Sequence, residues 1–230
     1  MRIQAFEVLF DVLFRDHADE CGPAMELILI RHALPMRREV LEGAADPELS
    51  DDGLAQARHL ADYLAIEPIH AIYSSPMRRA VQTAAPLGER LGLPVTTIDE
   101  VAEYDRLSSA YIPVEELKAT NDPRWQQMLA DDWGERDETR AEFGDRIQAA
   151  IEKVIAEHRS QNVAVVCHGG VINAFLARVL GTPDSTGFFY PNYTSIHRVV
   201  AGAGGQRQII SVNETPHLRG TGLPIGLYGK

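Results

Sequence analysis

Two short apolar runs that each end in a histidine constrain the fold of this chain more than any other feature. Residues 26–32 read ELILIRH, and residues 162–168 read NVAVVCH and are followed by two glycines. Short runs of Ile, Leu and Val are typical of strands that are covered on both faces, as in a parallel sheet. Side chains just past the carboxyl ends of such strands line the usual ligand crevice of an α/β protein. The sequence therefore predicts that His32 and His168 share one crevice.

The rest of the chain alternates strand-like and helix-like patterns. Helices are expected after Ser50 to Leu64, from Pro76 to Gly92, from Asp137 to His158 and from Val171 to Leu180, and further strands near residues 70–74, 93–98, 196–201 and 208–212. This order makes neighbouring strands parallel and puts helices on both faces of the sheet. At 230 residues the chain suits one sizeable domain. The predicted fold class is α/β, a three-layer sandwich around a mostly parallel mixed sheet.

Three segments depart from this alternation. Residues 1–24 precede the predicted domain, residues 25–213, and are expected to be an appended helix or strand, or a start-site artefact with Met25 as the true beginning. Residues 104–136 lose the periodicity and hold both tryptophans. Such a segment is often a lid or specificity element, and the alternative is a peripheral helical insertion whose aromatic side chains seal the core. Residues 214–230, rich in Gly and Pro, are expected to form a mobile tail.

Charge and composition narrow the partners. The chain has 22 Lys and Arg against 33 Asp and Glu, a net charge of −11, which argues against nucleic acid or an anionic membrane as partner. No apolar stretch approaches the roughly 20 residues of a membrane span. Glu7 and Asp11 interrupt the apolar N-terminal residues, which argues against a secretory signal. Of the two cysteines, Cys167 lies in a predicted buried strand, so we expect no disulfide and a cytoplasmic protein.

Arginines near the ends of two predicted strands, residues 26–32 and 70–74, indicate an anion site. Arg31 adjoins His32, and Arg78 and Arg79 open the helix that follows Ser74, Ser75 and Pro76, where free backbone N–H groups also favour anions. A guanidinium forks onto the oxygens of a phosphate or carboxylate. Taken singly, Arg31 could be a salt bridge at a strand end, and Arg78 and Arg79 a solvated helix face. Together with a second histidine, these groups could bind a phosphoryl group without a metal ion.

Four motifs in this order resemble those of the histidine phosphatase superfamily, also called the phosphoglycerate mutase-like proteins. The resemblance covers roughly residues 25–212. Its specific parts are Leu29-Ile30-Arg31-His32, then Leu49-Ser50 with Gly53 and Gln56-Ala57, then Ser74-Ser75-Pro76 with Arg79-Ala80 and Gln82-Thr83-Ala84, and finally Val165-Val166-Cys167-His168-Gly169-Gly170. Each motif alone is a weak signal, whereas the set with its spacing is specific.

The resemblance implies that His32 attacks phosphorus and becomes phosphohistidine. Arg31, Arg79 and His168 would hold the phosphoryl oxygens, with help from the backbone N–H of Gly169. A neutral imidazole is a usable nucleophile near neutral pH when its other nitrogen is fixed by a hydrogen bond. The expected substrate is a small phosphorylated molecule, no cofactor or metal is expected, and a homodimer is left open.

Release of an alkoxide requires a proton donor, and the loop after the third predicted strand offers four acids. They are Asp99, Glu100, Glu103 and Asp105. Glu103 best matches the acid position of the family, and Glu100 is the reserve. The alternative is that all four are solvated loop acids.

The loop after His32 departs from the family pattern. The family usually has glycine there, followed by Ser or Thr and then Asn, whereas this chain has Ala33, Pro35 and Arg38. Alanine would be strained if the backbone were left-handed. Loss of the polar positions favours a phosphatase over a phosphoglycerate mutase, which stays the alternative beside a non-catalytic phospho-ligand or interaction module. Arg37 and Arg38 could bind a second anionic group, or simply balance nearby glutamates.

Overall fold

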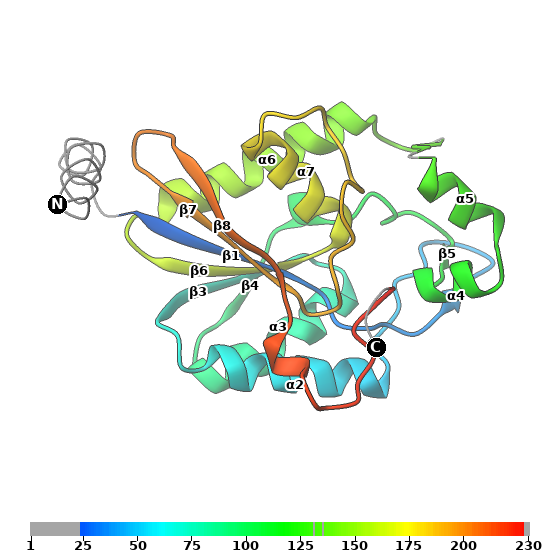
Figure 1. Cartoon of the computed structure of the whole chain (residues 1–230), viewed down its shortest axis with the longest axis horizontal. Coiled ribbons are helices and arrows are strands. Elements are labelled where there is room, and N and C mark those ends of the chain that lie inside the picture. The colour runs from blue at the N-terminus through cyan, green and yellow to red at the C-terminus, as the bar shows by residue number, and fades with distance from the viewer. Residues whose placement is uncertain (1–23, 131, 135, 228–230) are drawn as a thin grey trace, which may run out of the picture.

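A central six-stranded sheet organises the molecule, which is described by a computed structural model over residues 24–130, 132–134 and 136–227. Its strands are β1 (Met25–Arg31), β3 (Ile69–Ser74), β4 (Val95–Thr97), β6 (Asn162–Cys167), β7 (Ile196–Ala201) and β8 (Arg207–Glu214). They lie in the order β4-β3-β6-β1-β7-β8 (Figure 1). Strands β4, β3, β6 and β1 are mutually parallel, whereas β7 is antiparallel to both β1 and β8. The predicted mixed, mostly parallel sheet is confirmed.

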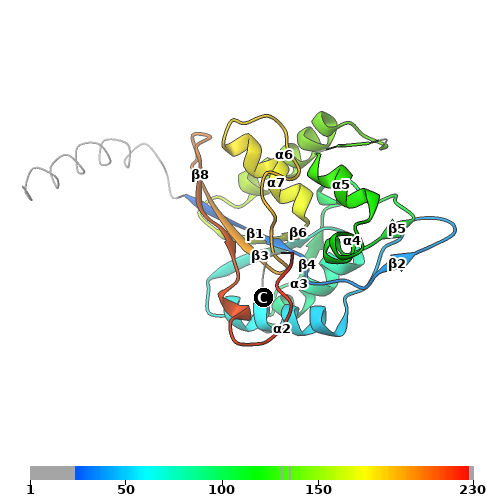
Figure 2. The same ribbon diagram turned by 45° about the vertical axis from the view of Figure 1, so that its right-hand side comes forward.

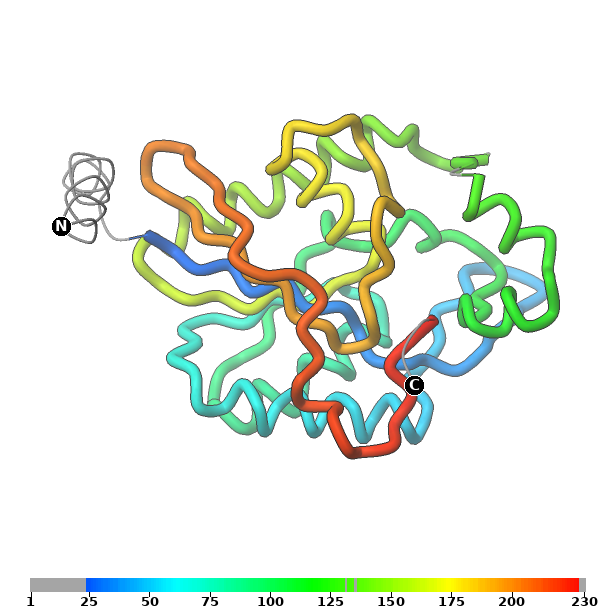
Figure 3. The backbone as a smooth tube through the Cα atoms, in the orientation of Figure 1, coloured from blue at the N-terminus to red at the C-terminus, as the bar shows by residue number. Residues whose placement is uncertain are grey.

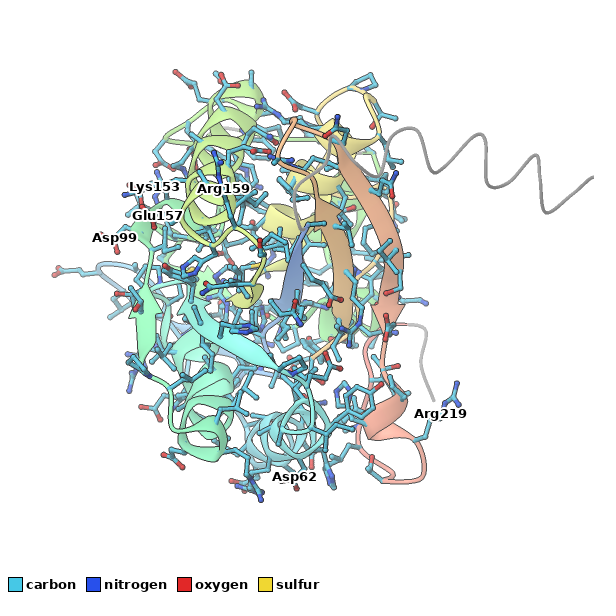
Figure 4. The ribbon with its side chains drawn as sticks, turned by 90° about the vertical axis from the view of Figure 1, so that its left-hand side faces the viewer. Asp62, Asp99, Lys153, Glu157, Arg159 and Arg219 are labelled. Carbon is cyan, nitrogen blue, oxygen red and sulfur yellow. The ribbon has the colours of Figure 1, made fainter. Side chains whose placement is uncertain are left out.

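Helices cover both faces of this sheet. Helices α2 (Asp51–Leu64) and α3 (Arg78–Leu91) pack on one face, and α6 (Arg140–Glu157) and α7 (Gly169–Val179) on the other (Figure 4). Alternate residues of β1 serve the two cores, with Leu27 and Leu29 under α6 and α7 and with Ile28 and Ile30 under α2 and α3. An apolar strand without polar alternation is what burial on both faces requires. The sheet and the two layers of helices together form the predicted three-layer sandwich.

Local signals explain where the helices begin. The Ser50 side chain accepts a hydrogen bond from the backbone N–H of Gly53 at 3.1 Å and caps α2. Thr139 and Glu142 form a reciprocal capping box at the start of α6. A Cβ atom at Gly53 would lie 2.1 Å from the Leu34 carbonyl oxygen, so this first turn admits only glycine. The same contact brings the loop after β1 close to α2.

The crevice opens where the chain leaves two neighbouring strands toward opposite faces of the sheet. Strand β1 leads to α2 on one face, and the adjacent β6 leads to α7 on the other. Their parallel register pairs Arg31 with Cys167, so the residues that follow both strands lie side by side. In open α/β sheets this change of direction creates the ligand crevice.

The segment over residues 104–136 covers one side of that crevice. It contains β5 (Ala110–Tyr111), which pairs with β2 (Arg38–Glu39), and the short helices α4 (Val114–Ala119) and α5 (Pro123–Leu129). Figure 2 shows these elements at the end of the sheet opposite the start of β1. Trp133 contacts the ring of Phe143 in the core, whereas Trp125 lines a cavity. The contact of Trp133 fits the interpretation of aromatic side chains that seal the core, and the lid or specificity role stays a prediction.

The C-terminal segment departs from its prediction. Residues 215–227 do not project freely, because Leu218 is buried and the Ile225 carbonyl oxygen accepts a hydrogen bond from the backbone N–H of Tyr193 at 2.8 Å. The Gln56 side chain donates to the Pro224 carbonyl oxygen at 2.5 Å. Figure 3 shows the segment passing α2 and then turning back. Three glycines of this segment have a positive φ, which glycine adopts readily in turns.

The N-terminal extension and Cys21 lie outside the described residues, so the predictions for them stay predictions. Cys167 is a free, buried cysteine in the core. In the part of the chain that the structure describes, no helix has the length and apolar character needed to cross a membrane.

Candidate active site

The two histidines that end β1 and β6 meet in the crevice. The ring centroids of His32 and His168 are 5.1 Å apart, and the planes are inclined by 58°. Only 3% of His32 and none of His168 is exposed. The predicted convergence of the two strand ends is therefore observed.

His32 has the protonation state that a nucleophile needs. Its Nδ1 lies 2.7 Å from the Ala33 carbonyl oxygen, which can only accept, so Nδ1 carries the proton and donates. Burial, and then the positive charges of Arg79 and Arg31, hold the pKa of His32 well below its ordinary value. The imidazole is thus neutral at neutral pH, and the lone pair resides on Nε2.

The alanine after this histidine causes no backbone strain. Ala33 is fully buried, its φ is not positive, and its backbone N–H donates to the Thr83 hydroxyl at 2.9 Å. Thr83 in turn donates to the Arg79 carbonyl oxygen at 2.7 Å. The loop after β1 is therefore tied to α3 without the left-handed conformation that would demand glycine.

An aromatic cage holds Arg31. Its guanidinium carbon lies 4.9 Å from the ring centroid of Tyr190 and 4.4 Å from that of Tyr193, and its Nη1 donates to the Pro191 carbonyl oxygen at 2.5 Å. Both tyrosine hydroxyls donate to Glu115 of α4, at 3.1 and 3.0 Å. The Nε of Arg31 is buried without a hydrogen-bond partner. This cation keeps a donor for an incoming anion.

Arg79 is also buried with unused donors. Its Nη2 donates to Asp105 at 2.9 Å, and its guanidinium lies over the Tyr111 ring at 4.7 Å. Its Nε and Nη1 are buried without a hydrogen bond, and Nη1 is 3.9 Å from the nearest oxygen of Asp46. An unsatisfied buried N–H costs about 1–3 kcal/mol, and an oxyanion would recover this cost.

His168 begins α7. Its Nε2 lies 2.7 Å from the Ser75 hydroxyl, while its Nδ1 is buried without a partner. Burial, followed by the charge of Arg79, lowers the pKa of His168 well below its ordinary value. Gly169 is the first residue of α7, and a Cβ on it would come 3.9 Å from Arg31 Nε. The positive end of α7 thus adjoins Arg31.

Glu103 is a buried carboxyl at the same helix terminus. Its Oε2 accepts from the backbone N–H of Gly170 at 2.8 Å, and its Oε1 accepts from that of Tyr104 at 3.1 Å. Burial first, and then the negative charge of Asp105, raise the pKa of Glu103 to about 7. A Cβ on Gly170 would lie 2.3 Å from Glu103 Oε1, so the contact requires glycine. A carboxyl that titrates near neutrality suits general acid–base work.

The structure leaves other candidates outside the cavity. Glu100 is exposed in the short 3-10 helix η1 (Asp99–Val101). Arg37 is exposed and pairs with Glu39 and Glu116, and the exposed Arg38 lies in β2, so neither lines the cavity. Arg78 pairs with Glu48 at the surface, whereas its neighbour Arg79 points inward.

The crevice widens into a cavity of about 590 Å³. Its inner end is formed by residues at the end of β1, at the starts of α3 and α7 and in the loop after η1, namely Arg31, His32, Arg79, Gly169 and Glu103. Its outer part is lined by α5, by the end of the 104–136 segment and by residues 186–191. Within the described residues, no group of three His, Cys, Asp or Glu side chains could hold a metal ion.

Sequence reasoning missed the residues that hold the phosphate-site arginines. Asp105 was only one of four loop acids, and Glu115, Tyr190 and Tyr193 were not singled out. The cluster Phe188-Phe189-Tyr190-Pro191 followed by Tyr193 was a visible signal, because such a density of rings just before a strand indicates a packed site.

Fold and site together define an α/β protein in which two buried histidines meet two buried arginines that have N–H groups without a hydrogen-bond partner. The chain belongs to the histidine phosphatase superfamily (branch 1), whose sequence profile matches residues 27–215. The resemblance inferred from the four motifs is thereby confirmed.

Two individual relatives and one solved structure agree with this family assignment. Phosphoserine phosphatase 1 of Hydrogenobacter thermophilus is 31% identical over 199 residues, which cover 84% of this chain and 94% of that protein. Glucosyl-3-phosphoglycerate phosphatase of Mycolicibacterium vanbaalenii is 30% identical over 175 residues, 68% of this chain and 75% of the relative. The structure of phosphoserine phosphatase from Entamoeba histolytica with 3-phosphoglyceric acid shares the fold, with a TM-score of 0.67 at 24% identity over 84% of this chain and 99% of that one.

Proposed function

We propose that this protein hydrolyses phosphoric monoesters of small molecules through a phosphohistidine on His32, without a metal ion. The observation that carries the proposal is the neutral His32, whose Nδ1–H is committed to the Ala33 carbonyl, beside two buried arginines with unused donors. The phosphatases among its relatives support the reaction class.

In the first step, His32 Nε2 attacks phosphorus while the ester P–O bond breaks. Arg31, Arg79 and His168 hold the phosphoryl oxygens, and the backbone N–H of Gly169 adds the positive end of α7. Glu103 gives its proton to the departing alkoxide, so the alcohol leaves neutral and Glu103 becomes a carboxylate. The products of this step are the alcohol and phosphohistidine.

In the second step, water attacks the phosphorus of phosphohistidine. The Glu103 carboxylate accepts a proton from that water, and the P–N bond breaks to release phosphate and restore neutral His32. Glu103 therefore ends the cycle protonated. A pKa of about 7 lets the same carboxyl give and take a proton near neutrality.

A phosphatase screen over a panel of phosphorylated metabolites tests this proposal. We expect phosphate release from several primary-alcohol monoesters, at the same rates with and without EDTA. Absence of turnover on the whole panel and on p-nitrophenyl phosphate would contradict the assignment and favour a binding module. Dependence on a restored metal ion would contradict the mechanism.

A further inference from the structure

We propose that the alcohol portion of the substrate is bulky and apolar and binds in the outer part of the cavity. This inference rests on the proposed phosphatase function. The surface concerned, here called the outer apolar wall, comprises Trp125, Met128 and Leu129 of α5 together with Phe188 and Phe189, and all five line the cavity. It is continuous with the inner end, where the phosphoryl group would bind.

Three side chains of the outer apolar wall are exposed, unlike those of the domain core. Met128 is 45% exposed, Leu129 59% and Phe188 48%. Helix α5 buries none of its residues against the domain. Single exposed apolar side chains are common, but several that line one cavity form a surface suited to an apolar ligand.

Two polar residues that line the cavity, Asn173 and Arg124, make hydrogen bonds within the protein. The Asn173 amide donates to the carbonyl oxygens of Gly169 and Phe189 and accepts from the backbone N–H of Phe189. Arg124 binds Asp122 through two nitrogens. The Asn173 amide therefore has little capacity left for the hydroxyls of a sugar or the charges of an amino acid.

One cation offers a competing mode of recognition. The Arg136 guanidinium lies 4.3 Å from the Tyr104 ring centroid and 5.1 Å from that of Trp133, and it lines the cavity. It could pair with a carboxylate on a small substrate. Size argues against this mode as the main one, because a cavity of about 590 Å³ lies within the range that holds drug-sized ligands, roughly 300–1,000 Å³.

Ethyl, butyl, hexyl and octyl phosphate provide the test, with O-phosphoserine as the carboxylate-bearing comparison. Primary alcohols of this series differ little in leaving-group basicity, so kcat/KM reports binding of the chain. Each added methylene should raise kcat/KM by up to about fourfold, until the chain fills the wall. Independence of chain length, or O-phosphoserine outperforming octyl phosphate, would overturn the inference, the latter in favour of Arg136.

Two variants localise the effect. Met128→Ser and Phe188→Ser come from opposite stretches of the wall, and each should flatten the rise of kcat/KM with chain length. Leu180→Ser is the matched control, since Leu180 is 56% exposed but lies outside the cavity. An unchanged rise in both wall variants would contradict the proposal. If no ester in the series is hydrolysed by the parent protein, the phosphatase assignment itself fails, which is a distinct result.

Discussion

The inner and outer ends of the cavity are built in opposite ways. At the inner end, His32, Arg79 and Glu103 are at most 7% exposed and are held by backbone groups or, for Arg79, by the half-buried Asp105. At the outer end, Met128 and Leu129 are about half exposed and sit on a short helix that buries nothing. Strand ends fix the geometry of the inner end, whereas a surface segment forms the outer end of the cavity.

This difference separates reaction from selectivity. Phosphoryl transfer needs charges and a nucleophile at fixed positions, which rigid strand ends provide. Choice of the alcohol needs only a surface of suitable shape and polarity, and such surfaces lie on segments that vary readily. Substitutions at the inner end should therefore affect every substrate, and substitutions at the outer end only some.

The largest expected effect is from His32→Ala. Removal of the attacking nitrogen should lower kcat by more than about a thousandfold on every phosphomonoester, because the covalent route is lost. His59→Ala, an exposed histidine on α2, is the matched control and should keep parental activity. If His32→Ala kept more than a tenth of the activity, the account of the inner end of the cavity would be wrong.

Glu103→Gln should come next, with an effect that depends on the leaving group. Alkyl phosphates expel a basic alkoxide, so their kcat/KM should fall by about 10²–10⁴, while p-nitrophenyl phosphate should lose far less. Glu100→Gln, a substitution of the exposed acid three residues earlier, should show no such pattern. A leaving-group-dependent loss in Glu100→Gln instead would reassign the proton donor.

The pH profile sharpens the same assignment. In the proposed mechanism the acid form of Glu103 donates the proton. The pKa of Glu103 is raised to about 7, so this acid form is present below that pH and lost above it. For an alkyl phosphate, kcat/KM should fall about tenfold per pH unit above about 7. Glu103→Gln should remove this alkaline limb. Persistence of the limb in the variant would assign it to another group.

Arg79→Ala should have a smaller effect, because other cations remain. Loss of a charge-assisted hydrogen bond of about 1.5–3 kcal/mol corresponds to roughly ten- to over a hundredfold in kcat/KM, with weaker inhibition by phosphate. Arg78→Ala should do much less, since Arg78 pairs with Glu48 at the surface. Equal losses in the two variants would mean that the fixed geometry of Arg79 does not matter.

The smallest expected effect is that of chelation. The proposed phosphoryl site takes its positive charge from Arg31 and Arg79, so exhaustive treatment with EDTA should leave kcat/KM unchanged. The control is recovery of activity on addition of zinc, magnesium or manganese to the treated protein. Activity that falls with EDTA and returns with a metal ion would place a metal at the inner end.

The sequence predicts some parts of this structure and not others. The strands, the helices on both faces and the meeting of His32 with His168 were predictable, because short apolar runs and strand ends obey general rules. The cage of Tyr190 and Tyr193 around Arg31 was not, since it joins a loop to a helix far away in sequence. The packed tail was missed for a related reason, because its contacts use backbone carbonyls that no side-chain pattern reveals.

The most direct test of the central claim is to trap the intermediate on His32. Rapid acid-free quench of the protein during turnover of a ³²P-labelled phosphomonoester, followed by peptide mapping, should recover labelled phosphate on the peptide containing His32. That label should be acid-labile and stable to base, as expected of phosphohistidine, and absent from His32→Ala. Two results under substrate saturation would contradict the account. One is turnover with the label at a residue other than His32, and the other is turnover with no label on the protein at all in the pre-steady state.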